Sequence, residues 1–294
     1  MYKLLDGKSY SLVLKEKLNL VFKNIANENI PTLGILQVGN LEESNIYIKH
    51  KITMANSLGI KAEFIKLHEN ANYDEIANGI KRLSNTTNGL IIQLPMQTTN
   101  LTSDEKNKLL NLIPNEKDID GLNDFNLNSK YTNNNFLPAT AKGIILLLKK
   151  YDIAIDNQNI AIVGFSNIVG RPLYNFFLNQ RNNIVTKYLK NTSRKPLKDA
   201  HIIIVATGQK NPIFANEVAN NTVIVDVGIH RDENKKISGD LDFDAFSKKA
   251  SYITPVPGGV GPMTVISLVL NLIKAYLLQF PEKTLFYNDI LNLL

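Results

Sequence analysis

The sequence predicts an α/β protein of two lobes, and three features predict this class. Short apolar stretches alternate with stretches of helical periodicity, as in parallel sheets that are covered by helices. The alternation starts again after a polar segment, Pro114–Lys130. The chain of 294 residues is also longer than one average domain. We therefore expect two αβ lobes around a cleft, with the C-terminal helix returning to the first lobe.

The first lobe is expected to contain three buried strands with helices between them. The helix that starts near Leu41 has recognisable ends, because Asn40 and Glu43 have the spacing of a capping box and Gly59 follows the last turn. The expected strands are Thr32–Val38, Lys61–Lys66 and Gly89–Gln93, and the expected helices are Asp6–Asn24, Leu41–Leu58, Tyr73–Leu83 and Ser103–Leu112.

The second lobe repeats the alternation and ends in a loop rich in glycine and proline. This loop, Thr254–Pro262, precedes a closing helix that is expected over Met263–Leu278. Residues 138–262 are therefore expected to form one domain, and residues 1–137 together with 263–294 the other. The expected strands are Asn159–Val163, Ile184–Tyr188, His201–Ala206 and Thr222–Val227, and the expected helices are Lys142–Tyr151 and Val169–Leu178.

The composition excludes several classes of function. The net charge is +6, but the lysines are scattered and no basic run is interleaved with aromatic residues, so nucleic acid is not expected as a partner. Cysteine is absent, and there are only four histidines and no HExxH motif, so we expect no metal centre. No signal peptide and no apolar run near membrane-spanning length are recognised, which predicts a soluble, cytoplasmic protein without a membrane partner.

The segment Ile160–Pro172, IAIVGFSNIVGRP, has the pattern of a strand, a glycine turn and a helix. Gly164 permits a tight turn, the following helix offers free N–H groups to a pyrophosphate, and Gly170 allows close packing of helix on strand. Ser166 replaces the usual second glycine, and the spacing is one residue longer than in GxGxxG. The pattern predicts a Rossmann-type dinucleotide site, with a purely structural turn as the alternative.

The residues around the next strand indicate which dinucleotide is bound. A carboxylate usually lies about 20 residues after the glycine turn and binds the ribose hydroxyls. Here the region contains cations and hydroxyl groups but no carboxylate, which suits a ribose phosphate and predicts NADP rather than NAD. A solvated basic edge is the alternative. The residues concerned are Lys187, Lys190, Thr192, Ser193, Arg194 and Lys195.

Two further predicted strands of this lobe also end in small residues. These ends are Ala206–Gly208 and Asp226–Ile229. Cofactors lie at the carboxyl ends of strands in open α/β sheets. Three such ends, including the glycine turn, carry small residues here, and this supports the dinucleotide site.

In the first lobe, a lysine lies beside the apolar stripe of the helix Leu41–Leu58. Tyr47 and Lys51 are i,i+4 neighbours along one flank of that stripe, next to Ser44. Partial burial there would lower the pKa of Lys51 and let it exchange protons near neutral pH. From the spacing alone, the alternative is favoured: a lysine with a packed stem and an amine in solvent. Lys49 and His50 are expected on the surface.

Three other segments carry polar groups or exposed backbone suited to a ligand. Gln93 ends a buried strand, where its amide could hold the lysine without fixing the charge. Asp118 and Asp120 precede Gly121 in a loop, and either carboxylate could accept from the N–H groups of a ligand; a turn aspartate is the alternative. The loop Thr254–Thr264 has three prolines and three glycines, which lets a flat ligand approach the main chain.

Taken together, these segments resemble the bifunctional methylenetetrahydrofolate dehydrogenase/cyclohydrolase family over almost the whole chain. The resemblance implies that Lys51 is the general acid/base, that Tyr47 stacks on or orients the substrate, and that Gln93 positions the lysine. It further implies that Asp120 binds the pterin ring. The matching stretches are DGKSYS, VGNLEESNIYIKHK, GLIIQLP, PNEKDIDGLN, PATAKG, VGFSNIVGRP, VDVGI and YITPVPGGVGPMT.

The resemblance also implies how the ligands are held. The backbone of Pro257, Gly258 and Gly259 would line the folate cleft. The dinucleotide would contact Gly164, Phe165, Ser166, Lys190 and Ile229, and the protein would form homodimers through the dinucleotide-binding lobes.

The chain departs from this family at positions near the dinucleotide. Phe165 stands where the family usually has an arginine, which removes one phosphate partner. Leu189–Lys190 replaces a histidine–serine pair, and Lys190 is expected to take over from the serine. His230 stands where asparagine is common, and Ala139 where cysteine is frequent. The segment after Gly121 lacks the family's usual histidine and glycine.

The reaction that the resemblance implies has two steps. Methylenetetrahydrofolate gives a hydride to NADP, and the methenyl product is then hydrolysed to formyltetrahydrofolate with Lys51 moving the protons. A monofunctional NAD-linked methylenetetrahydrofolate dehydrogenase is the main alternative. Another two-lobed dehydrogenase, such as one acting on shikimate, is a further alternative, but it should lack the tyrosine–lysine helix and the GLIIQLP strand. A non-catalytic folate- or nucleotide-binding protein would be expected to lose Lys51 or Gln93, and both are present.

Overall fold

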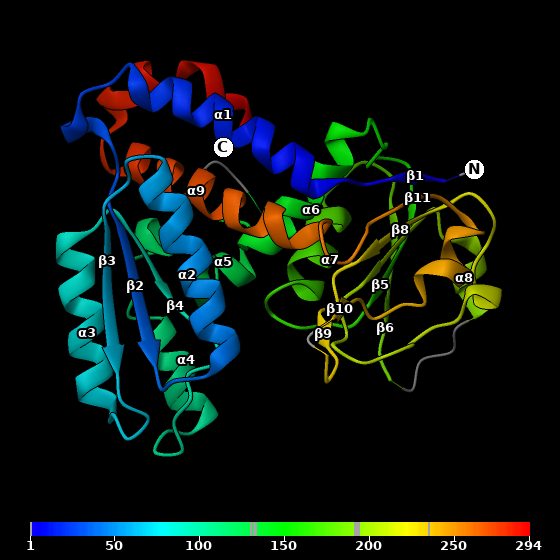
Figure 1. Cartoon of the computed structure of the whole chain (residues 1–294), viewed down its shortest axis with the longest axis horizontal. Coiled ribbons are helices and arrows are strands. Elements are labelled where there is room, and N and C mark those ends of the chain that lie inside the picture. Colours follow the sequence, from blue (N-terminus) through cyan, green and yellow to red (C-terminus); the bar gives the residue numbers. More distant parts are fainter. Residues whose placement is uncertain (1, 130, 132–133, 191–194, 235) are drawn as a thin grey trace. The chain divides into compact units, whose positions relative to one another are not determined.

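The structure is a computed structural model that describes residues 2–129, 131, 134–190, 195–234 and 236–294, without the side chains of residues 195 and 196. The chain divides into two compact units (Figure 1). Unit 1 consists of Met1–Val13 and Thr140–Thr264, and unit 2 consists of Leu14–Ala139 and Val265–Leu294.

These limits correct the expected domains at the N-terminus. The later boundaries, at residues 139/140 and 264/265, lie two residues from the expected ones. Residues 1–13, however, belong to unit 1, because strand β1 (Lys3–Leu4) pairs in parallel with β11 (Ala250–Ile253). The divisions fall within α1 (Gly7–Lys23) and near the start of α9 (Val260–Gln279).

Unit 1 is built on a six-stranded parallel sheet with the order β1-β11-β8-β7-β5-β6. All residues of β7 and β8 are buried, as expected for a parallel sheet that is covered on both faces. The carboxyl ends of β5, β7 and β8 therefore meet at one edge. The remaining elements are β5 (Asn159–Val163), β6 (Ile184–Tyr188), β7 (Ile202–Val205), β8 (Thr222–Asp226), the hairpin β9 (His230–Arg231) and β10 (Ile237–Ser238), α6 (Ala139–Lys150), α7 (Gly170–Leu178) and α8 (Phe243–Ser247).

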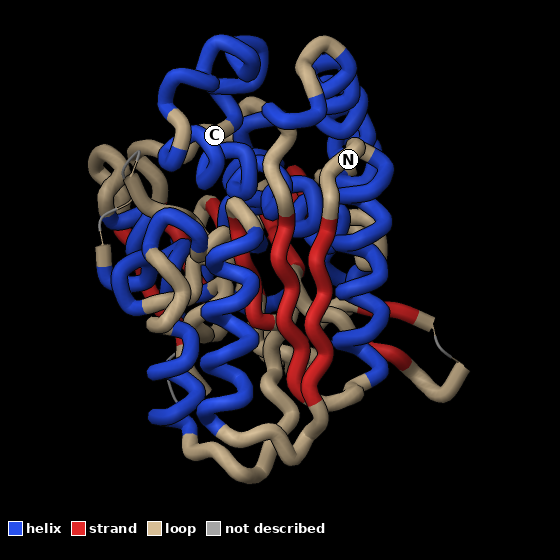
Figure 2. The backbone as a smooth tube through the Cα atoms, turned by 90° about the vertical axis from the view of Figure 1, so that its left-hand side faces the viewer, coloured by secondary structure: helices blue, strands red, loops and turns tan. Residues whose placement is uncertain are grey.

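Unit 2 is built on a three-stranded parallel sheet with the order β3-β2-β4 and helices on both faces (Figure 2). All six residues of the central strand β2 are buried. The strand order of this sheet brings the carboxyl ends of β2 and β4 together. The elements are β2 (Leu33–Val38), β3 (Ala62–Leu67), β4 (Gly89–Ile92), α2 (Glu42–Ser57), α3 (Tyr73–Thr86), α4 (Ser103–Leu110) and α5 (Asp124–Asn128), with a 3-10 helix at Pro281–Leu293.

Two local expectations for unit 2 are wrong. The N-cap of α2 is Leu41 without a side-chain cap, whereas the Oδ1 atom of Asn40 accepts from Lys66 Nζ (2.5 Å) and Asn45 Nδ2 (3.0 Å). The side chains of Lys66 and Asn45 therefore take the oxygen that was expected to cap the helix. The segment expected to be a loop also contains the short helix α5, capped by Asn123.

Helix α9 contradicts the expectation that no apolar stretch approaches membrane-spanning length. By length and composition its 20 residues could cross a membrane, with a mean hydropathy of 1.6 over the most apolar window. In the structure, 67% of that window is buried inside the protein. This burial is typical of a core helix in a soluble protein.

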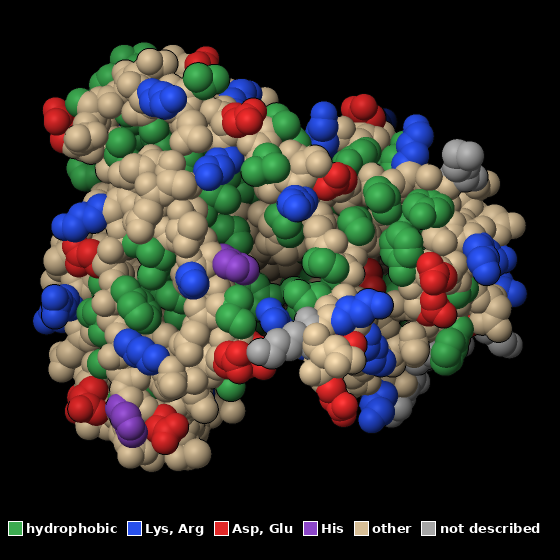
Figure 3. Space-filling view, viewed as in Figure 1, with side chains coloured by type: hydrophobic (Ala, Val, Ile, Leu, Met, Phe, Trp, Pro, Cys, Tyr) green, Lys and Arg blue, Asp and Glu red, His purple; other side chains and the backbone are tan. Residues whose placement is uncertain are grey.

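Charged side chains are distributed singly over unit 2 on the face that Figure 3 shows. Lys and Arg side chains there alternate with acidic, polar and apolar ones and form no continuous basic stripe (Figure 3). Such a distribution gives no support to a nucleic-acid interface.

Candidate active site

Lys51 lies in the core-facing stripe of α2 and not on its flank. The buried residues of this helix are Ser44, Ile48, Lys51 and Ala55, which follow one face at helical spacing. The side chain of Lys51 is 8% exposed. The alternative of a lysine with its amine in solvent is therefore wrong. Lys49 and His50 are exposed, as expected.

The amine of Lys51 donates a hydrogen bond of 3.0 Å to the Oε1 atom of Gln93, directly after β4. Burial lowers the pKa of Lys51, and the nearby charge of Asp120 opposes this effect. Asp120 itself is half-buried. A buried amine next to one neutral oxygen can exist in both protonation states, which is what a general acid/base requires.

The orientation of Gln93 is fixed by hydrogen bonds on both sides. Its backbone N–H donates to Leu36 O (2.8 Å) on β2, and its Nε2 atom donates to Leu94 O (2.8 Å). The amide nitrogen is thereby directed away from Lys51, and the oxygen faces the amine. The Leu94–Pro95 peptide bond that follows is cis. The expectation that Gln93 and the lysine face each other is confirmed.

The structure gives Asp118 a role that the sequence did not reveal. Its carboxylate is 1% exposed and accepts from Gly121 N (3.1 Å), Asn123 N (2.8 Å) and Asn126 Nδ2 (2.8 Å). Burial raises the pKa of Asp118 to about 6, because its effect outweighs that of the hydrogen bonds from Asn123 and Asn126, which lower the pKa. Asp118 thus holds the turn that carries Asp120. No sequence signal separates the two aspartates, because only the tertiary structure shows which one is buried.

Tyr47 lies one helical turn before Lys51 on α2 and is half-buried. This position agrees with the expected i,i+4 relation. Lys51, Gln93 and Asp120 are thus brought together within unit 2, with Tyr47 on the same helix.

In unit 1, the turn after β5 has the close packing that its glycines predict. Gly164 has a φ of +95°, and a Cβ atom there would lie 2.3 Å from Ala206 O. A Cβ atom on Gly170 would lie 2.1 Å from Gly164 O. Both positions therefore require glycine. The Oγ atom of Ser166 accepts from Val169 N (3.3 Å), so this serine closes the turn before α7.

Part of the predicted basic cluster lies beside this turn. The Nζ atom of Lys187 is 4.9 Å from the centroid of the Phe165 ring and 5.9 Å from that of Tyr174. Lys187 and Lys190 are both exposed at the end of β6. Thr192, Ser193 and Arg194, and the side chain of Lys195, lie outside the described residues.

The proline–glycine loop after β11 belongs to unit 1. Its Val256–Pro257 bond is cis, and Gly258 has a φ of +109°. A Cβ atom on Gly259 would lie 2.6 Å from Pro255 O, so only glycine fits there. Ile229, after β8, is 44% exposed and free to contact a ligand.

The described part of the chain contains no group of three or more His, Asp or Glu side chains that could hold a metal ion. Unit 1 combines a parallel sheet, a glycine turn and cations at its carboxyl edge, while unit 2 presents a buried lysine held by an amide. These features are typical of a two-unit α/β dehydrogenase, here with a buried lysine in unit 2.

Comparison with known proteins identifies the family. Residues 5–120 match the catalytic domain of tetrahydrofolate dehydrogenase/cyclohydrolase, and residues 138–280 match the NAD(P)-binding domain of the same family. The chain belongs to the tetrahydrofolate dehydrogenase/cyclohydrolase family.

Individual relatives match this chain over nearly its full length. The chain is 49% identical to the bifunctional protein FolD of Metamycoplasma arthritidis, with 95% of this chain and 94% of that protein covered. It is similar to the crystal structure of the bifunctional enzyme FolD from Campylobacter jejuni, with 36% identity, a TM-score of 0.88 and coverage of 95% and 100%. The Trypanosoma brucei enzyme, solved with NADP and an inhibitor, shares the fold at 24% identity, with a TM-score of 0.84 and coverage of 95% and 98%.

Proposed function

We propose that this enzyme oxidises methylenetetrahydrofolate with NADP and hydrolyses the methenyl product to formyltetrahydrofolate. The observation that carries the proposal is the buried amine of Lys51, 3.0 Å from the neutral oxygen of Gln93. Burial lowers the pKa of Lys51, so that the neutral amine is more populated at a given pH than that of an exposed lysine. A lysine that served only as a fixed cation would be expected to face a carboxylate directly.

In the first step, the residues of the chain mainly bind and orient. Bound NADP supplies the hydride acceptor for the bridging methylene group of the folate. The glycine turn has the compact form of a dinucleotide-binding turn, because Gly164 packs against Ala206 and Gly170 packs against Gly164 at distances where a Cβ atom would collide. We assign contacts with the dinucleotide to Gly164, Phe165, Ser166 and Ile229.

In the second step, Lys51 moves protons. Water attacks the cationic methenyl carbon, and the neutral amine of Lys51 accepts a proton from it. As the ring C–N bond breaks, the ammonium donates that proton to the leaving nitrogen. The remaining hydroxyl proton passes by way of the amine to solvent, which leaves the formyl group. The oxygen of Gln93 can accept a hydrogen bond from the ammonium and from the neutral amine, so it holds Lys51 throughout the cycle.

The other site residues have supporting roles in this proposal. Asp120, presented by the turn that Asp118 holds, accepts hydrogen bonds from the N–H groups of the pterin ring. Tyr47 stacks on or orients the substrate, and the backbone of Pro257–Gly259 contacts the folate. Support for these roles comes from the partial exposure of Asp120 and Tyr47 and from the glycine-only conformation of the loop.

The choice of NADP over NAD depends on the cations after β6. The Nζ atom of Lys187 lies 4.9 Å from the centroid of the Phe165 ring, directly after Gly164 in the glycine turn. Lys190 follows it, and both can contact a ribose phosphate. The trypanosomal enzyme was solved with NADP. The monofunctional NAD-linked alternative has less support, because the relatives reported above are named bifunctional.

We also propose a cytoplasmic homodimer that supplies one-carbon units for purine biosynthesis. The dimer would form through the dinucleotide-binding units. Edge strand β6 offers a surface for this contact, since Ile184 is 65% exposed and Leu178 and Leu189 near its ends are about half exposed. Light scattering tests this part, and a monomer at all protein concentrations would refute it.

One set of assays tests the main proposal on the wild-type enzyme. Oxidation of methylenetetrahydrofolate is measured with NAD and with NADP, and decay of methenyltetrahydrofolate is measured without dinucleotide. We expect faster oxidation with NADP and catalysed decay of the methenyl compound. Oxidation with NAD alone, or decay at the uncatalysed rate, would instead favour the monofunctional alternative.

A further inference from the structure

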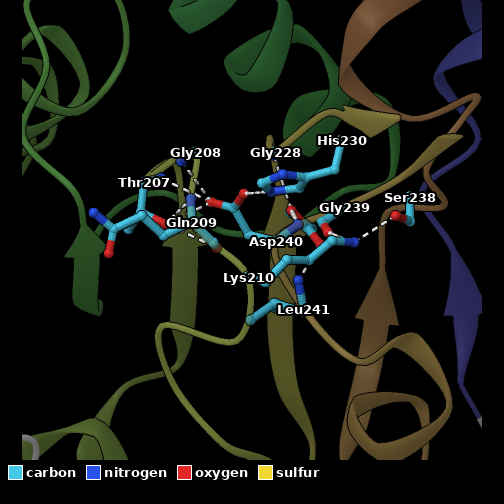
Figure 4. A network of polar contacts seen from close by, with 11 residues as sticks. Thr207, Gly208, Gln209, Lys210, Gly228, His230, Ser238, Gly239, Asp240 and Leu241 are labelled. Carbon is cyan, nitrogen blue, oxygen red and sulfur yellow. Dashed lines mark hydrogen bonds and ion pairs between the residues drawn. The ribbon is translucent and has the colours of Figure 1, made fainter. Parts of the chain in front are cut away.

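Asp240 is a fully buried carboxylate that joins three loops of unit 1. It is 0% exposed and lies two residues after the end of β10. Its Oδ2 atom accepts from Thr207 N (2.8 Å), Thr207 Oγ1 (2.7 Å) and Gly208 N (3.0 Å). Its Oδ1 atom lies 2.8 Å from Nε2 of His230. Figure 4 shows Asp240 between Thr207 and Gly208 on one side and His230 on the other.

The segments that Asp240 joins lie at the carboxyl ends of β7 and β8. Thr207 and Gly208 follow β7, and His230 follows β8 directly after the exposed Ile229. The residue before Thr207, Ala206, packs against the glycine turn, because a Cβ atom on Gly164 would meet its oxygen. This edge of the sheet is where open α/β folds bind dinucleotides. A buried group therefore fixes backbone that is itself partly exposed at the cofactor edge.

Neighbouring residues hold Asp240 in place. The Oδ1 atom of Asp226, at the end of β8, accepts from Asp240 N (3.0 Å) and Gly228 N (2.9 Å). A Cβ atom on Gly228 would lie 2.0 Å from Oδ1 of Asp240, so the carboxylate packs directly on this backbone. Lys210 Nζ donates to Gly239 O (3.1 Å), next to Asp240. The carboxylate has little freedom to turn away from its partners.

We infer that Asp240 is a positioning residue for dinucleotide binding, and that His230 completes its set of donors. A buried carboxylate binds strongly to N–H and O–H donors, and loss of one donor leaves a charged oxygen unpaired. Asp240 thereby sets the relative position of the loops after β7 and β8. The inference rests on the proposed use of NADP by unit 1.

The test compares Asp240→Asn with Asp242→Asn as a matched control. Asp242 is two residues further on and caps the exposed start of α8. Asp240→Asn removes the charge and leaves one acceptor oxygen where the carboxylate has two, so Thr207, Gly208 and His230 cannot all donate to it. We expect Asp240→Asn to raise the dissociation constant of NADP, measured by calorimetric titration, by about tenfold or more. Decay of methenyltetrahydrofolate without dinucleotide should stay within about twofold of the wild type, and Asp242→Asn should change neither value.

A second series tests His230. His230→Leu removes the donor, whereas His230→Gln places a neutral N–H group at a similar reach. We expect weaker NADP binding in the Leu variant and substantial recovery in the Gln variant. If Asp240→Asn does not fold, Thr207→Val replaces it, because this change removes one hydroxyl donor and keeps the backbone N–H.

Each result separates the inference from the proposed function. Failure of the wild type to bind NADP would refute the proposed use of NADP. Binding by the wild type with unchanged or tighter binding in folded Asp240→Asn would overturn the role of Asp240 alone. A parallel loss of hydrolysis and binding would mean that Asp240 stabilises the whole protein, and would overturn that role as well.

Discussion

Replacing Gln93 by Glu and by Leu should shift the pH profile of the hydrolysis in opposite directions. Gln93 Oε1 accepts a hydrogen bond of 3.0 Å from the buried amine of Lys51. A carboxylate at this place stabilises the ammonium and raises the pKa of Lys51, whereas Leu removes the acceptor and lowers that pKa. Because the neutral amine is the base, activity is lost as the pH falls through this pKa. The acid limb should therefore move up for Glu and down for Leu.

The magnitude follows from the geometry. Two unit charges 3.0 Å apart attract each other by about 5 kcal/mol at an effective dielectric constant of about 20. Burial of the new carboxylate offsets part of this attraction, so the acid limb of Gln93→Glu should move up by about 2 pH units. Loss of a hydrogen bond to a charged group costs about 1.5–3 kcal/mol, so the limb of Gln93→Leu should move down by about 1–2 units.

The assay follows the absorbance of methenyltetrahydrofolate without dinucleotide over a series of pH values. Gln97→Glu serves as the matched control, since Gln97 Oε1 accepts from Asn40 N (2.9 Å) and a carboxylate can do the same. Its profile should match the wild type. The reasoning would be refuted by shifts of the same sign in both Gln93 variants, or by unshifted profiles in folded protein.

Three further predictions concern the supporting residues. Asp120→Ala should raise the KM for folate by about tenfold with little change for NADP, and an unchanged folate KM would count against its role. Because the pKa of Asp118 is raised to about 6, the folded state binds a proton before the unfolded state does, and stability gains up to about 3 kcal/mol as the pH falls from about 6 to 4. Chemical denaturation should show this gain in the wild type and not in Asp118→Asn; equal slopes would contradict it. Gly164→Ala should weaken NADP binding by about tenfold or more, since its Cβ atom would meet Ala206 O at 2.3 Å. Gly59→Ala, at a φ of +75° in unit 2 and with only an ordinary contact at 3.8 Å, is the control for positive φ, and equal effects on NADP binding would argue against the close approach.

Local patterns predicted most of the elements of the fold. The strand Ile184–Tyr188 was predicted with its observed limits, and Gly59, with a φ of +75°, follows α2 as expected. The pairing of β1 with β11 was missed, because it joins residues far apart in the sequence. The cap at Asn40 failed because its side chain binds Lys66, from the neighbouring strand β3, and Asn45 on α2 itself.

The sequence predicted which residues form the candidate site, but not which of their side chains are buried. Spacing placed Lys51 beside the apolar stripe and could not show that its amine is buried against Gln93, because that contact depends on the pairing of β2 and β4. The roles of Asp118 and Asp240 were not predicted. Each acts through backbone N–H groups of other residues, and no residue type marks such donors in a sequence.

Whether the amine of Lys51 carries the protons of hydrolysis is tested most directly by comparing Lys51→Met with Lys49→Met. Lys49 lies on the same helix but is exposed. Decay of methenyltetrahydrofolate is measured in both variants, and NADP binding is titrated in parallel. We expect Lys51→Met to lose hydrolysis by about a hundredfold or more with unchanged NADP affinity, and Lys49→Met to match the wild type. Turnover of Lys51→Met at the wild-type rate would contradict the account.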